Sequence, residues 1–141
     1  MRLSSMPGRR SVSAFALATS LGLLAGCADQ TANGDIGRKY VLFFTKGSTA
    51  ISPAGSGVLR QAARVAGRHP DLGVLVAGFA AAHGNIDADQ ALSEQRARIV
   101  AAALQGDGVP AARIVERARP PSNEDPGVAA RRVEVSFFQQ P

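Results

Sequence analysis

The stretch that decides the fold of this 141-residue chain is LSEQRARIV, Leu92 to Val100. Apolar residues recur here at helical spacing and continue to Leu104, with arginines between them. This pattern predicts an amphipathic helix, which we place at Asp87 to Gln105. Asp87 is followed three residues later by Gln90, a pair that predicts a capping box at the start of the helix. The glycines and proline that follow would end it.

Two strands and another helix are predicted on the N-terminal side of this segment. Leu72 to Phe79 reads LGVLVAGF, a largely apolar run that is typical of a strand central in its sheet. Lys39 to Thr45 contains YVLFF, which favours a further strand. Ser52-Pro53 is a favourable helix start, because serine caps free N–H groups and proline suits the first helical position. This earlier helix should end at His69-Pro70.

The C-terminal side continues with two more strands. Ile114 to Arg117 is a short β-like run, and Pro120 to Gly127 is rich in turn residues. Arg131 to Phe138 alternates apolar and polar residues, which predicts a half-buried strand. The order strand–helix–strand–helix–strand–strand predicts an α+β fold, a two-layer α/β sandwich with its helices on one face of a sheet.

Several of these segments agree, in order and in register, with one known domain family. LSEQRARIV, followed by Leu104 and Gly108-Val109, fits the pattern LSxxRAxxVxxxL…GV, and Arg131 to Val135 reads RRVEV. The chain therefore resembles the OmpA-like C-terminal domain family, of the peptidoglycan-associated lipoprotein type, over about Tyr40 to Phe138. The resemblance implies a mixed sheet and a domain at residues 38–141. Further matching positions are Phe43, Phe44, Ser48, Pro53, Gly55, Gly78 and Gly84.

The resemblance also implies a ligand. Members of the family bind diaminopimelate of the peptidoglycan stem peptide: an arginine of the LSxxRA motif holds its carboxylate, and a loop aspartate pairs with its ammonium. Arg96 occupies the arginine position, and a guanidinium fork suits a carboxylate. Ala81 stands at the aspartate position, so the ligand-binding loop is degenerate, and Thr45 replaces a further acidic residue. Phe44 and Leu92 would shape the pocket.

Asp89 is a candidate substitute for the missing carboxylate. Asp89, Leu92 and Arg96 are spaced i, i+3 and i+7, which places them on one face of the helix. Asp89 would lie two turns from Arg96, about 10 Å along the axis. Two simpler interpretations stay open. In the first, Asp89 only interacts favourably with the positive end of the helix dipole. In the second, Arg96 is a solvated charge whose aliphatic stem lies on the core.

The N-terminal segment has the parts of an export signal. Met1 to Arg10 is basic, and Ser11 to Leu24 is largely apolar but too short to span a bilayer. Leu24 to Cys27 (LAGC) resembles the lipobox of bacterial lipoproteins, which implies that residues 1–26 are removed and that Cys27 is acylated. The alternative is an ordinary signal whose cleavage site happens to contain a cysteine. Cys27 is the only cysteine of the chain.

The resemblance further implies where the domain is held. Ala28 rather than aspartate follows the cysteine, which favours the outer membrane. Residues 28–37 are polar and Gly-containing, so residues 27–37 are expected to form a lipidated tether. The expected location is the periplasmic face of the outer membrane, with the membrane as a partner through the lipid anchor.

Charge and composition limit the remaining functions. The formal charge of 16 − 11 = +5 falls to 13 − 11 = +2 without the signal, so nucleic acid is not an expected partner. His69 and His83 are isolated, and no cofactor motif occurs, so we expect no metal, no cofactor and no enzyme.

Two functional hypotheses remain. The favoured one is non-covalent tethering of the envelope to peptidoglycan. The alternative is a degenerate domain without wall binding that acts as a structural or interaction component of an envelope complex with protein partners. Binding stays feasible if Arg96 points into an open groove beside Phe79 and Ala81. It does not if Phe79 fills that groove.

Overall fold

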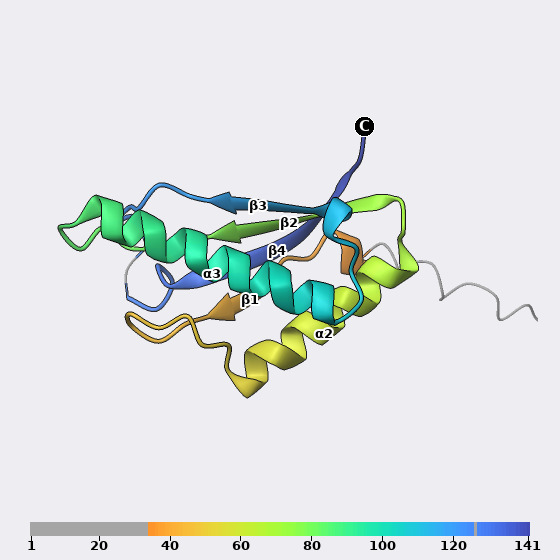
Figure 1. Ribbon diagram of the computed structural model, residues 1–141, viewed down its shortest axis with the longest axis horizontal. Helices are drawn as coiled ribbons and strands as arrows, with labels where there is room; N and C mark the ends of the chain where they lie inside the picture. The colour runs from red at the N-terminus through yellow and green to blue at the C-terminus, as the bar shows by residue number, and fades with distance from the viewer. Residues whose placement is uncertain (1–33, 126) are drawn as a thin grey trace, which may run out of the picture.

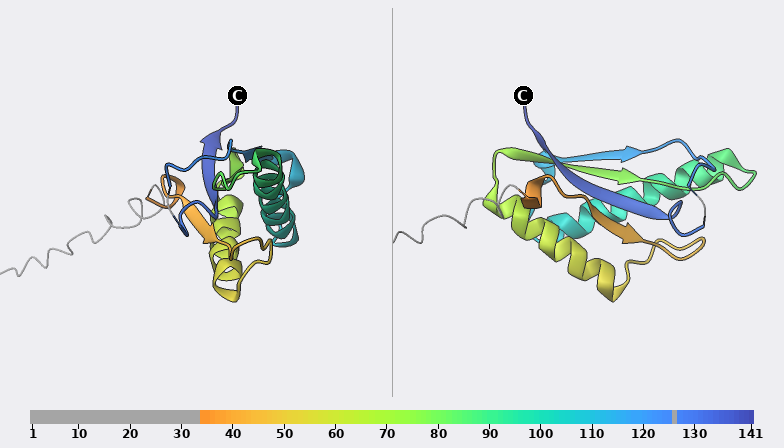
Figure 2. Two further views of the ribbon diagram at one scale, coloured as in Figure 1. Left: turned by 90° about the vertical axis from the view of Figure 1, so that its left-hand side faces the viewer. Right: turned by 180° about the vertical axis from the view of Figure 1, so that it is seen from behind.

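The computed structural model describes residues 34–125 and 127–141 as a four-stranded sheet covered by helices on one face (Figures 1 and 2). The strand order is β1-β4-β2-β3, in which β4 is antiparallel to both neighbours and β2 is parallel to β3. The predicted α+β sandwich with a mixed sheet is therefore confirmed. The elements are β1 (Tyr40–Phe43), α2 (Pro53–Arg68), β2 (Leu72–Gly78), α3 (Ile86–Gly106), the 3-10 turn η1 (Ala111–Arg113), β3 (Ile114–Ala118) and β4 (Arg132–Gln139).

Helix α2 begins and ends where its sequence predicts. The Ser52 hydroxyl accepts a hydrogen bond from the Gly55 N–H at 3.1 Å, and Pro53 occupies the first turn. The apolar residues at helical spacing, among them Leu59 and Val65, are buried against the sheet. The helix ends at Arg68, before the proline that cannot continue it.

Helix α3 is capped by a different residue from the expected one. The side chain of Asn85 accepts a hydrogen bond from the Ala88 N–H at 3.0 Å, so the predicted capping box of Asp87 and Gln90 is wrong. Asn85 has extended backbone geometry (φ −117°, ψ 91°), which suits a cap, whereas Asp87 already lies inside the first turn. Two aspartates in that turn, Asp87 and Asp89, complement the helix dipole.

The sheet and α3 approach each other closely at Gly78. A Cβ atom at this position would meet the backbone carbonyl oxygen of Ser93, closer than real Cβ atoms come. Because glycine lacks that atom, the middle of α3 rests directly on the end of β2. Around this contact the core is formed by Val76, Val133 and Val100, all fully buried. The close approach fixes the position of Arg96, one turn after Ser93 on the same helix.

The described chain begins beside the C-terminal end of α2. Asp35 forms an ion pair with Arg68 at 3.1 Å, and its carbonyl accepts a hydrogen bond from the Tyr40 hydroxyl at 3.3 Å. Ile36 packs against the core. Asp35 and Ile36, which we assigned to the tether, therefore contact the domain. The expected signal peptide at residues 1–26 and the anchor Cys27 lie outside the described residues, and among those described no helix is long and apolar enough to cross a membrane.

Candidate functional site

The N-terminal turn of α3 lies at the end of the molecule opposite to the start of the described chain (Figure 1). A small hollow lies beside this turn. Its volume is about 190 Å³. Small-molecule sites usually enclose roughly 300–1,000 Å³, so this hollow suits one end of a side chain rather than a whole sugar or nucleotide. Its lining comes from the loop after β1, the loop between β2 and α3, helix α3 and the residue before β4: Lys46, Gly47, Ala80, Ala81, His83, Asp89, Leu92, Arg96 and Arg131.

Arg96 is a buried charge that is held by backbone carbonyls. Its side chain is 0% exposed. Nε donates to the Ser48 carbonyl at 2.9 Å and Nη2 donates to the Thr45 carbonyl at 3.2 Å, while the guanidinium carbon lies 5.2 Å from the centre of the Phe44 ring. These contacts fasten the loop after β1 to α3. The interpretation of Arg96 as a solvated helix charge is therefore wrong.

One nitrogen of the Arg96 guanidinium lacks an acceptor. Nη1 is buried and has no hydrogen-bond partner among the described residues. Leaving a buried donor unsatisfied costs about 1–3 kcal/mol, and more when the group is charged. Burial lowers the pKa of Arg96 and the charge of Arg131 lowers it further, although a guanidinium stays protonated at neutral pH. An anionic oxygen at Nη1 would satisfy both the donor and the charge.

Asp89 lines the same hollow and holds the loop between β2 and α3. Its Oδ2 accepts a hydrogen bond from the His83 N–H at 2.6 Å, and its Oδ1 lies 3.5 Å from His83 Nδ1. His83 Nδ1 also lies 3.1 Å from the Ala81 carbonyl oxygen. Asp89 is therefore more than a partner of the helix dipole. The contact with His83 was missed, because in sequence the two residues lie on either side of a glycine turn.

Phe79 does not fill the groove. Its ring lies under the Arg132 guanidinium, 3.8 Å from ring centre to guanidinium carbon, and it is not part of the lining. Ala81 does line the hollow together with Arg96. The obstacle that would have ruled out binding, a groove filled by Phe79, is therefore absent among the described lining residues, and binding at Arg96 stays a prediction.

The other predicted residues occupy different depths. Leu92 lines the hollow, whereas Phe44 is 3% exposed and lies beneath the guanidinium of Arg96 without lining it. Lys46 and Arg131 line it and were not singled out from the sequence. Arg131 donates to the Phe44 carbonyl at 3.3 Å and to the Gly127 carbonyl at 3.0 Å. The signal that could have indicated Arg131 is the RR pair at the start of β4, of which Arg131 is the first member.

The charges around the hollow favour an anion. Among the described lining residues, Lys46, Arg96 and Arg131 are cationic and Asp89 is acidic. A ligand with a carboxylate would therefore be attracted by the field of the site. The described part of the chain contains no group of three or more side chains that could hold a metal ion.

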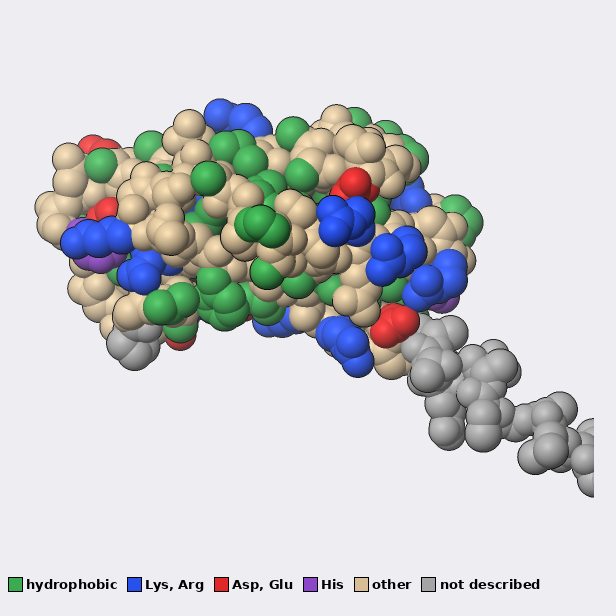
Figure 3. Space-filling view, turned by 90° about the horizontal axis from the view of Figure 1, so that it is seen from below, with side chains coloured by type: hydrophobic (Ala, Val, Ile, Leu, Met, Phe, Trp, Pro, Cys, Tyr) green, Lys and Arg blue, Asp and Glu red, His purple; other side chains and the backbone are tan. Residues whose placement is uncertain are grey.

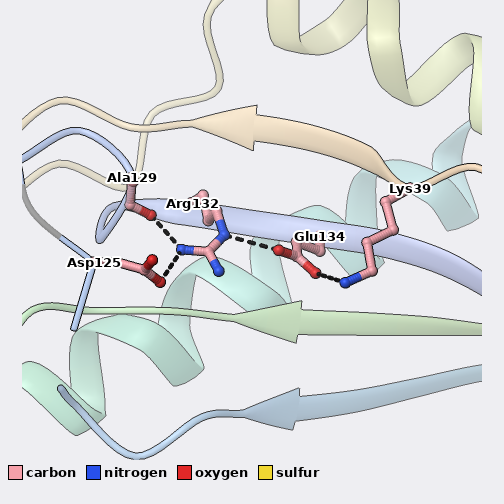
Figure 4. A network of polar contacts seen from close by, with 5 residues as sticks. All are labelled: Lys39, Asp125, Ala129, Arg132 and Glu134. Atoms are coloured by element: carbon pink, nitrogen blue, oxygen red, sulfur yellow. Dashed lines mark hydrogen bonds and ion pairs between the residues drawn. The ribbon is translucent and has the colours of Figure 1, made fainter.

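A second polar cluster lies on the sheet face that the helices leave open, around the start of β4 (Figure 4). Arg132 pairs with Asp125 at 2.7 Å and with Glu134 at 2.8 Å, and Glu134 pairs with Lys39 at 2.9 Å. Burial raises the pKa of Glu134, but hydrogen bonds and charges from Arg132 and Lys39 outweigh it, so the net pKa lies below its usual value. The members satisfy one another, which makes this cluster structural.

Comparison with known families agrees with the fold and the motifs. Residues 43–134 match the OmpA family, so the chain belongs to that family. It is 38% identical over 80 residues to a protein of Escherichia coli (strain K12) described as "Probable lipoprotein YiaD". That match covers 57% of this chain and 36% of the relative, so the chain spans only about a third of the relative's length.

Solved structures share the fold at low sequence identity. The peptidoglycan-associated lipoprotein from Burkholderia pseudomallei superposes with a TM-score of 0.64 at 22% identity, over 74% of this chain and 93% of that one. The C-terminal domain of Helicobacter pylori MotB gives 0.63 at 19% identity, over 73% and 85%. The OmpA-like domain of FopA1 from Francisella tularensis subsp. tularensis gives 0.61 at 19% identity, over 73% and 75%.

Proposed function

We propose that this protein is a lipid-anchored component of the bacterial outer membrane that binds peptidoglycan non-covalently and so tethers the envelope. The single observation that carries the proposal is the buried Arg96 guanidinium at the wall of the hollow, with Nη1 unsatisfied among the described residues. A carboxylate oxygen there would accept a charge-assisted hydrogen bond. The similarity to a peptidoglycan-associated lipoprotein and to a probable lipoprotein supports this assignment.

The proposed ligand is the side-chain end of diaminopimelate in the stem peptide. This end carries one carboxylate and one ammonium, and its size suits a hollow of about 190 Å³. Arg96 would hold the carboxylate. Asp89, 13% exposed and lining the same hollow, would offer the nearest carboxylate to the ammonium, while Leu92 would contact the methylene groups between them. The proposal is for a binding protein and not an enzyme.

The anchor belongs to the same proposal. Acylation of Cys27 after removal of residues 1–26 would hold the protein on the periplasmic face of the outer membrane, because two or more acyl chains give stable attachment. In Figure 1 the described chain begins at the end of the molecule opposite to the start of α3, beside which the hollow lies. The hollow would therefore be presented away from the membrane, toward the wall.

A second function is favoured by one observation. Ala81 removes the carboxylate with which the family pairs the ammonium, and Asp89 already accepts a hydrogen bond from His83. Under this alternative the domain has lost the wall ligand and serves as an interaction component of an envelope complex. The two functions differ in whether the isolated domain binds peptidoglycan.

The deciding experiment is retention of the domain Ala28 to Pro141 on purified diaminopimelate-type sacculi. We expect the native domain to be retained and to be released by free meso-diaminopimelate. Arg96→Ala and Asp89→Ala should each lose retention by about tenfold or more, since each removes a charged contact to the ligand. Arg98→Ala, an exposed arginine on the same helix, is the matched control and should be retained.

Circular dichroism must show that all variants are folded, because Arg96 also fastens the loop after β1. Absence of retention for the folded native domain would reject wall binding and favour the interaction component. Equal retention of the native, Arg96 and Asp89 variants would place any binding outside this hollow.

A further inference from the structure

Helix α2 presents a row of arginines that the wall-binding proposal does not use. Arg60, Arg64 and Arg68 are spaced i, i+4 and i+8, so they lie along one face of the helix, and all three are exposed. The sixteen residues of α2 include no aspartate or glutamate. Figure 3, which views the molecule from the α2 side, shows lysine and arginine side chains gathered near the point where the described chain begins.

Only part of this charge is neutralised within the domain. Arg68 is paired with Asp35 at 3.1 Å. Among the described residues, Arg60 and Arg64 form no ion pair, although Asp107 lines the same shallow hollow as both. Arg38 is also exposed and lies at the same end, close enough for its charge to act on Tyr40. The face therefore keeps a net positive charge.

The start of the described chain places this face within reach of a membrane. Six residues lie between Cys27 and Gly34, so seven steps along the chain join them, and a stretch of that length spans at most about 25 Å. Asp35 is fastened to Arg68, and Arg60 lies two helical turns from Arg68, about 12 Å along the axis. A lipid on Cys27 would therefore keep the row of Arg60, Arg64 and Arg68 close to the membrane. At that distance the row could contact the lipid headgroups.

From these observations, and resting on the proposed lipid anchor, we infer that the face of Arg60 and Arg64 docks onto anionic phospholipid headgroups of the leaflet that carries the anchor. Arginine forms bidentate hydrogen bonds with phosphate, and each basic side chain at an anionic surface favours the docked state by roughly fivefold. Docking along α2 would leave the hollow at the far end of the molecule open to the wall.

The test uses the acylated protein reconstituted in two kinds of vesicle, phosphatidylcholine alone or phosphatidylcholine with about 30 mol% phosphatidylglycerol. Both are measured at about 0.1 M salt. A donor dye is attached to Gln61→Cys, an exposed position beside the basic row, since acylation blocks the thiol of Cys27. Energy transfer to an acceptor lipid reports docking. We expect higher transfer with phosphatidylglycerol, and a loss of that increase as salt is raised.

Charge reversal separates docking from general attraction. Arg60→Glu with Arg64→Glu should lower the ratio of docked to undocked protein by about 25-fold or more, returning transfer to the value in pure phosphatidylcholine. The matched control reverses two exposed arginines outside α2, Arg98→Glu with Arg117→Glu, and should keep the increase. Equal transfer in both lipids, or the same loss in the control, would overturn the inference.

Separate measurements distinguish a failure of membrane docking from a failure of the proposed function. The mass of the N-terminal peptide reports acylation of Cys27, and an unacylated chain would remove the basis for docking. Sacculus retention is measured without lipid, and neither Arg60 nor Arg64 lines the hollow proposed for the wall ligand. An acylated protein that binds sacculi but shows no lipid-dependent transfer would reject docking while leaving wall binding intact.

Discussion

Two residues of the hollow, Arg96 and Ala81, carry opposite implications for the ligand. Arg96 brings a buried guanidinium whose Nη1 lacks an acceptor among the described residues, a cost that is offset if a ligand carboxylate occupies the site. Ala81 lines the same hollow with a methyl group, so an ammonium beside it finds no charge there. The proposed binding of a zwitterion at this site would therefore depend on Asp89 for the second charge.

Restoring a carboxylate at position 81 should strengthen binding. We expect Ala81→Asp to raise the affinity for diaminopimelate-containing muropeptides about tenfold or more, because a second charged hydrogen bond would form with the ammonium. Isothermal titration of the native and variant domains measures this. Ala82→Asp is the control, since its N–H faces the Ser122 carbonyl and it does not line the hollow. An equal gain in both variants would show only a general charge effect.

At the scale of elements, a side chain distant in sequence closes the end of α2. Arg113, in η1, donates to the carbonyls of Ala66 at 3.1 Å, His69 at 2.7 Å and Leu72 at 2.8 Å. The last carbonyls of a helix have no partner within it, and a cation at this end also suits the helix dipole. Arg113 thus joins α2 to the strands β2 and β3.

We expect Arg113→Ala to lower the free energy of unfolding by about 2–4 kcal/mol, since three charge-assisted hydrogen bonds are lost and the carbonyls are left poorly satisfied. Urea denaturation followed by circular dichroism measures the change. Arg117→Ala, in the adjacent β3, removes an exposed arginine and should change stability by no more than about 0.5 kcal/mol. Similar losses in the two variants would argue against the capping role.

For the whole molecule, the free energy of unfolding should depend on pH through the polar cluster on the open face of the sheet. Its members are Lys39, Asp125, Arg132 and Glu134. The pKa of Glu134 is lowered in the folded state. Its contribution is therefore present above its unfolded pKa, about 4.3, and is lost as the pH falls through the lower folded value. Protonation of Glu134 would remove its ion pair with Lys39 and weaken its hydrogen bond with Arg132, the first residue of β4.

We expect Glu134→Gln to cost about 1–2 kcal/mol at pH 7 and to flatten the loss of stability between about pH 5 and pH 3. Thermal unfolding measured across this range tests it. Glu116→Gln, an exposed carboxyl in β3, should follow the native curve. A Glu134 variant that keeps the native acid dependence would show that other carboxyl groups dominate.

In the part of the chain that the structure describes, the regions for the two proposed functions lie at opposite ends. The hollow lies beside the start of α3, and the described chain begins beside the end of α2 (Figure 1). The proposed anchor and basic row would thus face the membrane, and the proposed peptidoglycan site would face away from it.

The sequence by itself determined the order of the elements and most of their bounds. Apolar spacing in Leu92 to Val100, alternation in Arg131 to Phe138 and the Ser52-Pro53 start are local signals, because helix and strand periods are properties of the backbone. The cap of α3 was misassigned since Asn85 and Asp87 are both good caps in sequence, and only the backbone angles distinguish them.

Only the tertiary structure decided which contacts the residues of the candidate site make. The motif indicated Arg96, but its burial depends on carbonyls about fifty positions earlier in the chain. The hydrogen bond between Asp89 and His83 depends on how the intervening loop turns. The hydrogen bonds of Arg113 depend on the strands folding back to the end of α2. These contacts join residues that no local period relates. The side chains of Arg96, Asp89 and Arg113 bond to backbone groups, which every residue carries. The sequence therefore does not indicate which backbone group each side chain contacts.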